Sequence, residues 1–132
     1  MCMVGLVLVS HSGKIAEGLK DLTAEIASKH KGIVAAGGME DGSIGTDAIR
    51  ISEAIRQAND GDGVVVLADL GSGVMSSETA IELLEDEDIK VVLADAPLVE
   101  GTIAAAVTAM VGSPLEAVLK SAENTRSQKK IQ

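Results

Sequence analysis

The sequence predicts a single α/β domain, built on a doubly wound sheet of four parallel strands with helices on both faces. Two observations predict this class: four short apolar runs rich in β-branched residues, and segments of helical periodicity between them. The length of 132 residues suits one domain, and a hydrophobic content of 46% is enough for a proper core.

The predicted strands are the four apolar runs, and flanking glycine and aspartate residues favour strands over buried helices there. They cover residues 4–9, 33–36, 63–68 and 89–94. Their near lack of polar alternation is typical of strands that helices cover on both faces. For so short a chain the default arrangement is flavodoxin-like, with the strand order 2-1-3-4 and right-handed crossovers.

The spacing of apolar residues predicts a helix after each strand. The first helix carries an apolar stripe that we expect to face the sheet, made of Ile15, Leu19, Leu22 and Ile26. The second contains Ile49 and Ile55, with Thr46 as the candidate amino-terminal cap. The third is predicted over residues 74–85. His30, between two lysines at the end of the first helix, is expected to be exposed.

The fourth predicted helix, residues 99–111, is apolar on nearly every side. Such a helix must be covered on both sides, and a domain of this size has little with which to cover it. The helix is therefore either sunk deep in the monomer or part of a subunit interface. We favour the interface, and hence a homodimer.

The last predicted helix has the clearest local signal in the chain. Ser113, Pro114 and Glu116 have the spacing of a capping box with proline at the first helical position. The domain is expected to span residues 1–123, and residues 124–132 are expected to form a polar carboxyl-terminal tail.

The composition excludes several classes of function. The chain has 20 Asp and Glu against 11 Lys and Arg, and it contains no Phe, Trp or Tyr. Nucleic-acid binding is not expected, because the chain lacks both a basic surface and aromatic platforms for bases. A single cysteine, Cys2, and two histidines provide no ligand set for structural zinc. No apolar stretch approaches the ~20 residues that span a bilayer. We expect a cytoplasmic protein without metal or cofactor.

The candidate catalytic residues follow the first and third strands. In a sheet of order 2-1-3-4 these strands are neighbours, so His11 and Asp69 should face one another at the point where the strand order reverses. Asp69 could accept the proton of one imidazole nitrogen and leave the lone pair of the other free to attack. The pair therefore predicts a nucleophile for a phosphoryl group and a phosphohistidine intermediate.

Small residues beside this pair could hold a phosphate group. The amino termini of helices supply free N–H donors, and glycine lets the backbone approach closely. The candidate phosphate-binding residues are Ser12, Gly13, Thr46, Gly71, Ser72 and Gly73.

Three other chemistries could use the same residues. A Ser–His–Asp hydrolase is disfavoured, because Ser10 and Ser12 are sequence neighbours of His11 whose side chains diverge, and no G-x-S-x-G motif exists. Phosphorylation of Asp69 would need magnesium held by acidic residues after the first strand, and none are there. A non-catalytic flavodoxin-like module that binds a nucleotide or flavin stays an alternative.

Three motifs in this order resemble those of a known family. They are VSHSGKIAEG at residues 9–18, GGMEDGSIGT at residues 37–46 and LADLGSG at residues 67–73, and the likeness extends through residues 94–101. They are similar to the DhaM family, the phosphotransferase subunits of phosphoenolpyruvate-dependent dihydroxyacetone kinases. This family is related to the mannose-type IIA domains of the bacterial sugar phosphotransferase system (PTS).

The resemblance implies a function and a set of partners. His11 would accept a phosphoryl group from phospho-HPr, oriented by Asp69, and pass it to ADP bound on the DhaL subunit. The ATP so formed would phosphorylate dihydroxyacetone bound to DhaK. The family relationship also implies a homodimer, although no strand is predicted after Glu123, where mannose-type domains carry a swapped strand. The closest alternative is the same carrier chemistry in a mannose-type sugar transporter.

Four apolar residues cluster in sequence around the same crevice. They are Met39, Leu70, Val74 and Met75. We expect them to form a rim that docks two different partners in turn, a role that suits the adaptable methionine side chain.

Overall fold

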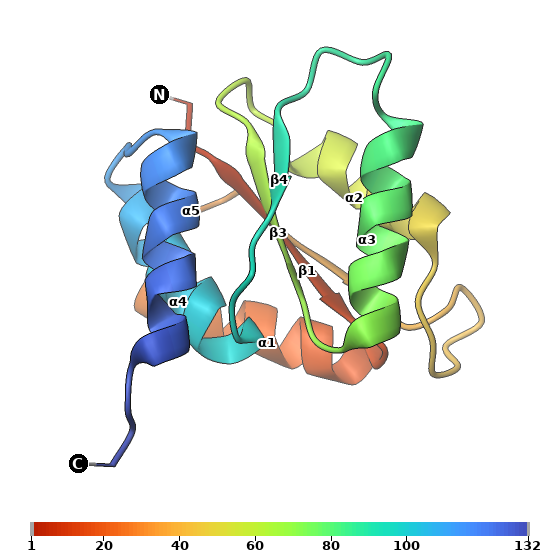
Figure 1. Ribbon diagram of the computed structural model, residues 1–132, viewed down its shortest axis with the longest axis horizontal. Helices are drawn as coiled ribbons and strands as arrows, with labels where there is room; N and C mark the ends of the chain where they lie inside the picture. The colour runs from red at the N-terminus through yellow and green to blue at the C-terminus, as the bar shows by residue number, and fades with distance from the viewer. Residues whose placement is uncertain (1, 132) are drawn as a thin grey trace.

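The computed structural model describes residues 2–131 and alternates strands with helices (Figure 1). The elements are β1 (Gly5–Ser10), α1 (Gly13–Ile26), β2 (Ile33–Gly37), α2 (Ala48–Ala58), β3 (Val64–Ala68), α3 (Gly71–Leu83), β4 (Val91–Leu93), α4 (Leu98–Met110), α5 (Leu115–Asn124) and a 3-10 turn (Thr125–Ser127). All strand pairs are parallel, and the strand order is β2-β1-β3-β4. The predicted fold class and strand order are confirmed.

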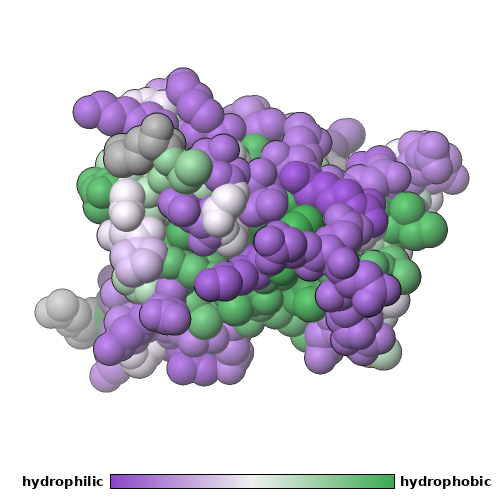
Figure 2. Space-filling view, turned by 90° about the horizontal axis from the view of Figure 1, so that it is seen from above, coloured by the Kyte–Doolittle hydropathy of each residue, from purple (hydrophilic) through white to green (hydrophobic). Residues whose placement is uncertain are grey.

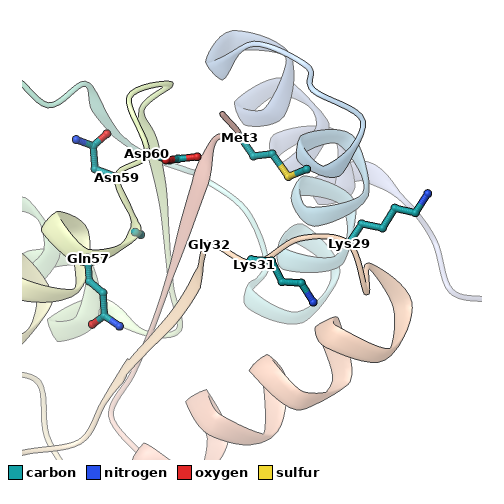
Figure 3. A pocket seen from close by; sticks show the side chains of 8 residues that line it. Met3, Lys29, Lys31, Gly32, Gln57, Asn59 and Asp60 are labelled. Atoms are coloured by element: carbon teal, nitrogen blue, oxygen red, sulfur yellow. The ribbon is translucent and has the colours of Figure 1, made fainter. Parts of the chain in front are cut away.

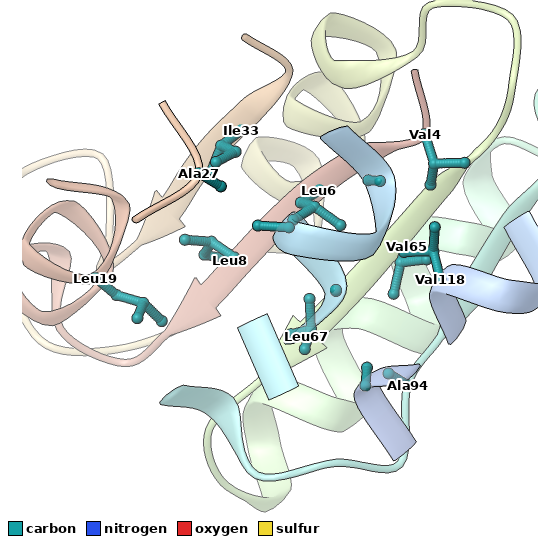
Figure 4. Close-up of a cluster of buried hydrophobic side chains, with 14 residues drawn as sticks. Val4, Leu6, Leu8, Leu19, Ala27, Ile33, Val65, Leu67, Ala94 and Val118 are labelled. Carbon is teal, nitrogen blue, oxygen red and sulfur yellow. The ribbon is translucent and has the colours of Figure 1, made fainter. Parts of the chain in front are cut away.

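Two helical layers enclose the sheet. Successive residues of β1 and β3 point to opposite faces, and both strands are buried throughout. On one face, Leu6 and Leu8 of β1 and Leu67 of β3 belong to a core shared with α1, α4 and α5 (Figure 4). On the other face, Val7 and Val66 belong to a core shared with α2 and α3. Burial on both faces explains why these two central strands lack polar alternation.

The register brings the carboxyl ends of the central strands together. Val9 of β1 lies opposite Ala68 of β3, and Ser10 lies opposite Gly37 of β2. The N–H of Asp69 donates to the carbonyl oxygen of Val9 at 3.1 Å, which continues the ladder by one residue. The residues that follow β1 and β3 therefore emerge side by side at the lower edge of the sheet in Figure 1.

The sheet-facing stripe predicted for α1 is mostly wrong. Three of its four residues are about half exposed: Ile15, Leu22 and Ile26. The buried face of α1 carries Ala16, Leu19 and Thr23 instead. The reason is the close approach of α1 to β2, since a Cβ added to Gly37 would lie 2.7 Å from the Cβ of Ala16. Only a small side chain therefore fits at position 16, where α1 passes Gly37.

The cap predicted for α2 is also wrong. Asp47 caps this helix, and its Oδ1 accepts the N–H groups of Ile49 at 2.9 Å and Arg50 at 3.4 Å. The helix starts one residue later than a cap at Thr46 requires, so the hydroxyl of Thr46 is available for contacts with α3 instead.

The capping box predicted for α5 does not form. The helix begins at Leu115, so Pro114 occupies the cap position and Ser113 lies one residue outside it. A capping box needs the serine at the cap itself, three residues before the glutamate. No side-chain bond to this cap is found in the described part of the chain. At the other end, α5 includes Asn124, and Thr125 is buried.

His30 is buried rather than exposed. Its side chain lies at the amino edge of the sheet, where Nε2 donates to the carbonyl oxygen of Val4 at 2.8 Å and Nδ1 accepts the N–H of Gly32 at 3.0 Å. Burial lowers the pKa of His30, and the bond to Val4 only partly opposes this shift. The turn after α1 folds the ring back against β1, which the local sequence does not reveal.

The helix α4 is not covered on every side within the described residues. Its buried face carries small residues, namely Gly101, Thr102, Ala105, Ala106 and Ala109. Val99 and Val107 are exposed on the side that the chain leaves open. Deep burial within the monomer is therefore excluded for this helix, and the subunit interface stays a prediction.

The chain carries a net charge of −9. Figure 2 shows the amino edge of the sheet from above, with hydrophilic residues over most of the face and hydrophobic ones gathered in its middle. Among residues 2–131, no helix is long and apolar enough to cross a membrane, and no cluster of three or more His, Cys, Asp or Glu could hold a metal ion.

Candidate active site

His11 and Asp69 are in direct contact at the carboxyl edge of the sheet. The distance from His11 Nδ1 to Asp69 Oδ1 is 2.9 Å, and the backbone N–H of His11 donates to Asp69 Oδ2 at 3.0 Å. Both side chains are partly exposed, 25% for His11 and 17% for Asp69. The topology therefore brings together the two residues that the sequence proposed as a pair.

The Asp69 carboxylate accepts four hydrogen bonds. Besides the two from His11, Oδ1 accepts the N–H of Leu70 at 2.7 Å and Oδ2 accepts the hydroxyl of Ser10 at 2.9 Å. Partial burial raises the pKa of Asp69, but the combined hydrogen bonds outweigh it and hold this pKa below its usual value. An ionised carboxylate only accepts hydrogen bonds, so Nδ1 of His11 carries a proton, and in the neutral form of the ring the lone pair is on Nε2.

The second ring nitrogen of His11 points to the start of α3. Nε2 contacts the hydroxyl of Ser72, which donates to the lone pair. No side chain caps this helix, because Leu70 occupies the cap position. The N–H groups of residues 71–73 therefore have no partner within the helix, and they form its positive dipole end. The lone pair of the imidazole and a set of donors for an anion lie next to each other.

Gly73 allows this close approach. A Cβ at this position would lie 2.9 Å from Asp69 Oδ1 and 3.8 Å from His11 Cε1. Gly71, in contrast, has no atom within 4 Å of such a Cβ. The two glycines of α3 thus differ: Gly73 packs against the pair of His11 and Asp69, and Gly71 is open to solvent.

Ser12 and Gly13 build the start of α1. The hydroxyl of Ser12 accepts the N–H of Ile15 at 3.3 Å, and its own N–H donates to Ser10 Oγ at 3.1 Å. Gly13 packs against β2, where an added Cβ would lie 3.3 Å from the Gly37 carbonyl oxygen. The hydroxyl and the backbone N–H of Ser12 therefore both form hydrogen bonds with nearby residues of the chain.

The glycine-rich loop between β2 and α2 is tied to the same site. The N–H of Gly38 donates to the Ser10 carbonyl at 3.0 Å, and the N–H of Gly45 donates to the His11 carbonyl at 2.8 Å. Gly38 has a φ of +68°, which favours glycine. The loop thereby fixes the backbone on either side of the His11 ring.

Thr46 links this loop to α3. Its hydroxyl lies 2.7 Å from the Ser76 hydroxyl and donates to the carbonyl oxygen of Ser72 at 3.3 Å. Thr46 therefore contacts the backbone of Ser72, whose hydroxyl touches His11. Through this contact and the one to Ser76, Thr46 holds the start of α3 in position.

Three of the four predicted rim residues are exposed beside the pair. Leu70 and Met75 are each 67% exposed, and Val74 is 39% exposed. Met39 is partly buried, and its Sδ fills the space where a Cβ on Gly45 would lie. Sequence reasoning missed Ile44, which is 73% exposed in the same loop. A lone apolar residue within a polar, glycine-rich loop was the available signal.

Two of the cavities formed by the described residues lie at opposite edges of the sheet. One of about 300 Å³ adjoins the pair and is lined by Ala68, Asp69, Val74, Leu93, Ala94, Asp95 and Ala96. The other, of about 340 Å³, lies at the amino edge (Figure 3) and is lined by Met3, Lys29, Lys31, Gly32, Gln57, Ala58, Asn59 and Asp60. The cavity at the amino edge contains neither His11 nor Asp69.

Comparison with known proteins places the chain among phosphotransferase components. The family model EIIA-man, described as PTS system fructose IIA component, matches residues 5–119. A solved structure titled as a protein of unknown function, EF1359, superposes with a TM-score of 0.85 at 37% identity. It covers 99% of this chain and 100% of its own.

Curated relatives carry the name DhaM. The phosphoryl donor subunit DhaM of PEP-dependent dihydroxyacetone kinase 2 from Listeria innocua is 41% identical over 92% of this chain and 98% of its own length. The corresponding subunit of Escherichia coli strain K12 is 43% identical over 98% of this chain, which spans 28% of that longer protein. The chain therefore belongs to the EIIA-man family of PTS IIA components, within its DhaM group.

Proposed function

We propose that this protein is the phosphoryl donor subunit of a phosphoenolpyruvate-dependent dihydroxyacetone kinase and that it carries the phosphoryl group on Nε2 of His11. The observation that supports this most is the arrangement of His11, with Nδ1 bound to the Asp69 carboxylate and Nε2 directed at the uncapped start of α3. The names of the DhaM relatives point to the same function.

The first transfer needs no proton movement on this protein. The lone pair of His11 Nε2 attacks the phosphorus of phospho-HPr, the new N–P bond forms, and the N–P bond of the donor breaks with its electron pair returning to the donor imidazole. The positive charge that develops on the His11 ring lies against the Asp69 carboxylate. The N–H groups of residues 71–73 and the exposed Ser72 hydroxyl, once it turns from Nε2, can donate to the phosphoryl oxygens.

The second transfer reverses these roles. An oxygen of the β-phosphate of ADP, bound on DhaL, attacks the phosphorus, and the N–P bond breaks. The His11 ring leaves as a neutral imidazole that retains its proton on Nδ1. The ATP formed on DhaL then phosphorylates dihydroxyacetone on DhaK. Neither step requires a cofactor or a metal ion held by this chain.

The exposed apolar residues around His11 suit the docking of both partners. Leu70, Met75 and Ile44 are at least two-thirds exposed, and each lies on a segment that contacts His11 or Asp69: the start of α3 or the loop that ends at Gly45. The net charge of −9 favours a partner with a basic face, because complementary charge speeds encounter. The two partners would use this rim in turn, since both must reach the same Nε2 atom.

A homodimer in the cytoplasm completes the proposal. Half-exposed apolar residues of α1, such as Leu22 and Ile26, and exposed valines of α4, such as Val107, lie on the same side of the sheet. Burying this face in a second copy would cover the part of α4 that the chain leaves open. Val107→Glu is expected to convert the dimer to a monomer in light scattering; a wild-type monomer would contradict it.

The decisive experiment is phosphoryl transfer with purified components. Incubation with labelled phosphoenolpyruvate, enzyme I and HPr should label the wild type and His30→Ala, and it should not label His11→Ala. Adding DhaL, ADP, DhaK and dihydroxyacetone should then discharge the label. A labelled His11→Ala protein would contradict the site, and label that passes only to a sugar-transport component would favour the transporter alternative.

A further inference from the structure

Ser10 is a buried polar residue at the end of an otherwise apolar strand. Its side chain has no exposed surface. The hydroxyl donates to Asp69 Oδ2 at 2.9 Å and accepts the N–H of Ser12 at 3.1 Å. One buried hydroxyl therefore joins the carboxylate that follows β3 to the chain segment that begins α1.

We propose that Ser10 is a positioning residue for phosphoryl transfer, because its hydroxyl holds the Asp69 carboxylate in the orientation that directs Oδ1 at His11 Nδ1. This inference rests on the proposed function, since it concerns the same imidazole. It gives a role to Ser10, although the transfer chemistry of His11 and Asp69 does not itself require a serine.

The distribution of donors supports this role. Each oxygen of Asp69 accepts two hydrogen bonds: Oδ1 from Leu70 N–H and the His11 ring, and Oδ2 from His11 N–H and the Ser10 hydroxyl. Within the described residues, Ser10 is the one side chain other than His11 that bonds this carboxylate. Without its hydroxyl, only the adjacent backbone and the ring itself would orient Asp69.

The link to Ser12 gives the hydroxyl a second function. Ser12 caps α1, and its N–H is fixed by Ser10 Oγ. The His11 backbone lies between these two serines, so its ring is placed by a segment anchored at both ends. A shift of about 1 Å in a reacting group can cost on the order of 10²-fold in rate. Partial loss of this anchoring should therefore lower the rate by about tenfold.

The test compares hydroxyl-containing and hydroxyl-free variants. Ser10→Ala should accept label from phospho-HPr with kcat lowered about tenfold and an unchanged KM, because the docking rim is not altered. Ser10→Thr keeps a hydroxyl and should restore most of the rate. Ser10→Cys keeps the size with a weak donor and should behave like Ser10→Ala, which provides a second variant if the alanine protein does not fold.

Ser52→Ala is the matched control. Ser52 is a buried serine of α2 whose hydroxyl donates to a backbone carbonyl, that of Ile49 at 2.7 Å, away from the pair. Its loss should lower the melting temperature and leave kcat unchanged. If Ser10→Ala keeps the wild-type kcat, raises KM instead, or is not improved upon by Ser10→Thr, the proposal is overturned.

A spectroscopic readout separates this inference from the proposed function. In the unphosphorylated protein, ¹⁵N NMR of the His11 ring should show the single Nδ1–H tautomer in the wild type and in Ser10→Thr. Ser10→Ala should show a mixture of tautomers. An unchanged tautomer in Ser10→Ala overturns the positioning role. A wild-type protein that takes no label overturns the proposed function but leaves the tautomer comparison valid.

Discussion

His11 and His30 lie at opposite edges of the same sheet, and their surroundings give one type of side chain two different chemistries. His30 is 5% exposed, and the backbone holds both of its ring nitrogens, through the carbonyl of Val4 and the N–H of Gly32. His11 has one nitrogen on a carboxylate and the other on an exposed hydroxyl, that of Ser72. A hydroxyl side chain can turn away, whereas a backbone N–H in a fixed turn cannot. Only His11 can therefore offer a lone pair to an incoming phosphorus atom.

The two edges also differ in what their helices present. In this parallel fold the amino termini of α1 and α3 lie at the carboxyl edge of the sheet, beside His11, and the carboxyl termini of α1 and α2 lie at the amino edge (Figure 1). Helix amino termini favour anions and carboxyl termini disfavour them. The lining of the 340 Å³ cavity at the amino edge includes Lys29 and Lys31 but no helix amino terminus, whereas the other edge places the N–H donors of a helix amino terminus beside a ring nitrogen of His11.

The strongest test of this contrast is Asp69→Asn. The amide keeps the shape but loses the charge, and its NH₂ group would face donors that now bond the carboxylate. We expect phosphorylation of His11 to slow on the order of 10²-fold, measured by rapid quench. Asp95→Asn is the control, because Asp95 lines the adjacent cavity but pairs with Arg126. A rate within twofold of wild type in Asp69→Asn would remove the carboxylate from the mechanism.

At the amino edge, His30→Ala should affect folding and not transfer. It leaves the Val4 carbonyl and the Gly32 N–H without their partner, which should lower the free energy of unfolding by about 2 kcal/mol. Urea denaturation measures this loss, and labelling by phospho-HPr below the transition should match the wild type. Loss of labelling in the folded variant would show that the two edges are coupled.

At the carboxyl edge, Gly73→Ala should displace the Asp69 carboxylate. Its Cβ would lie 2.9 Å from Asp69 Oδ1, so the carboxylate must shift and transfer should slow by about tenfold. Gly18→Ala is the control, since nothing lies within 4 Å of its Cβ in the middle of α1. This control should gain about 0.5–1 kcal/mol of stability with an unchanged rate. Equal rates in both variants would show that the site tolerates a displaced Asp69.

The smallest expected effect is a pH dependence of stability that comes from His30. Its pKa is lowered in the folded protein, mainly by burial, so below the ordinary value of 6.5 the unfolded chain binds a proton that the folded protein does not. The contribution of His30 to the free energy of unfolding should be fully present above pH 6.5. It should fall as the pH drops below 6.5, by at most about 1.4 kcal/mol per pH unit. Denaturation curves of the wild type and His30→Gln between pH 7 and 5 test this. An equal slope in both proteins would assign the effect to other groups.

The central pair could be predicted because its position depends on topology alone. His11 and Asp69 each follow a strand, and neighbouring parallel strands end at the same edge. The sheet-facing side of α1 could not be predicted in the same way. Its choice of Ala16 over Ile15 depends on how closely Gly37 approaches the helix, and that distance is set by two elements that pack together.

Local sequence patterns were enough to predict the number, kind and order of the strands and helices, because continuous apolar runs and helical periodicity are local properties of the chain. The sequence also determined that a histidine and an aspartate follow the two central strands. Only the tertiary structure decided that Ser10 joins this pair, that Asp47 and not Thr46 caps α2, and that His30 is buried. Those outcomes depend on contacts between residues that are distant in the chain or on where a turn directs a side chain, and local patterns contain neither.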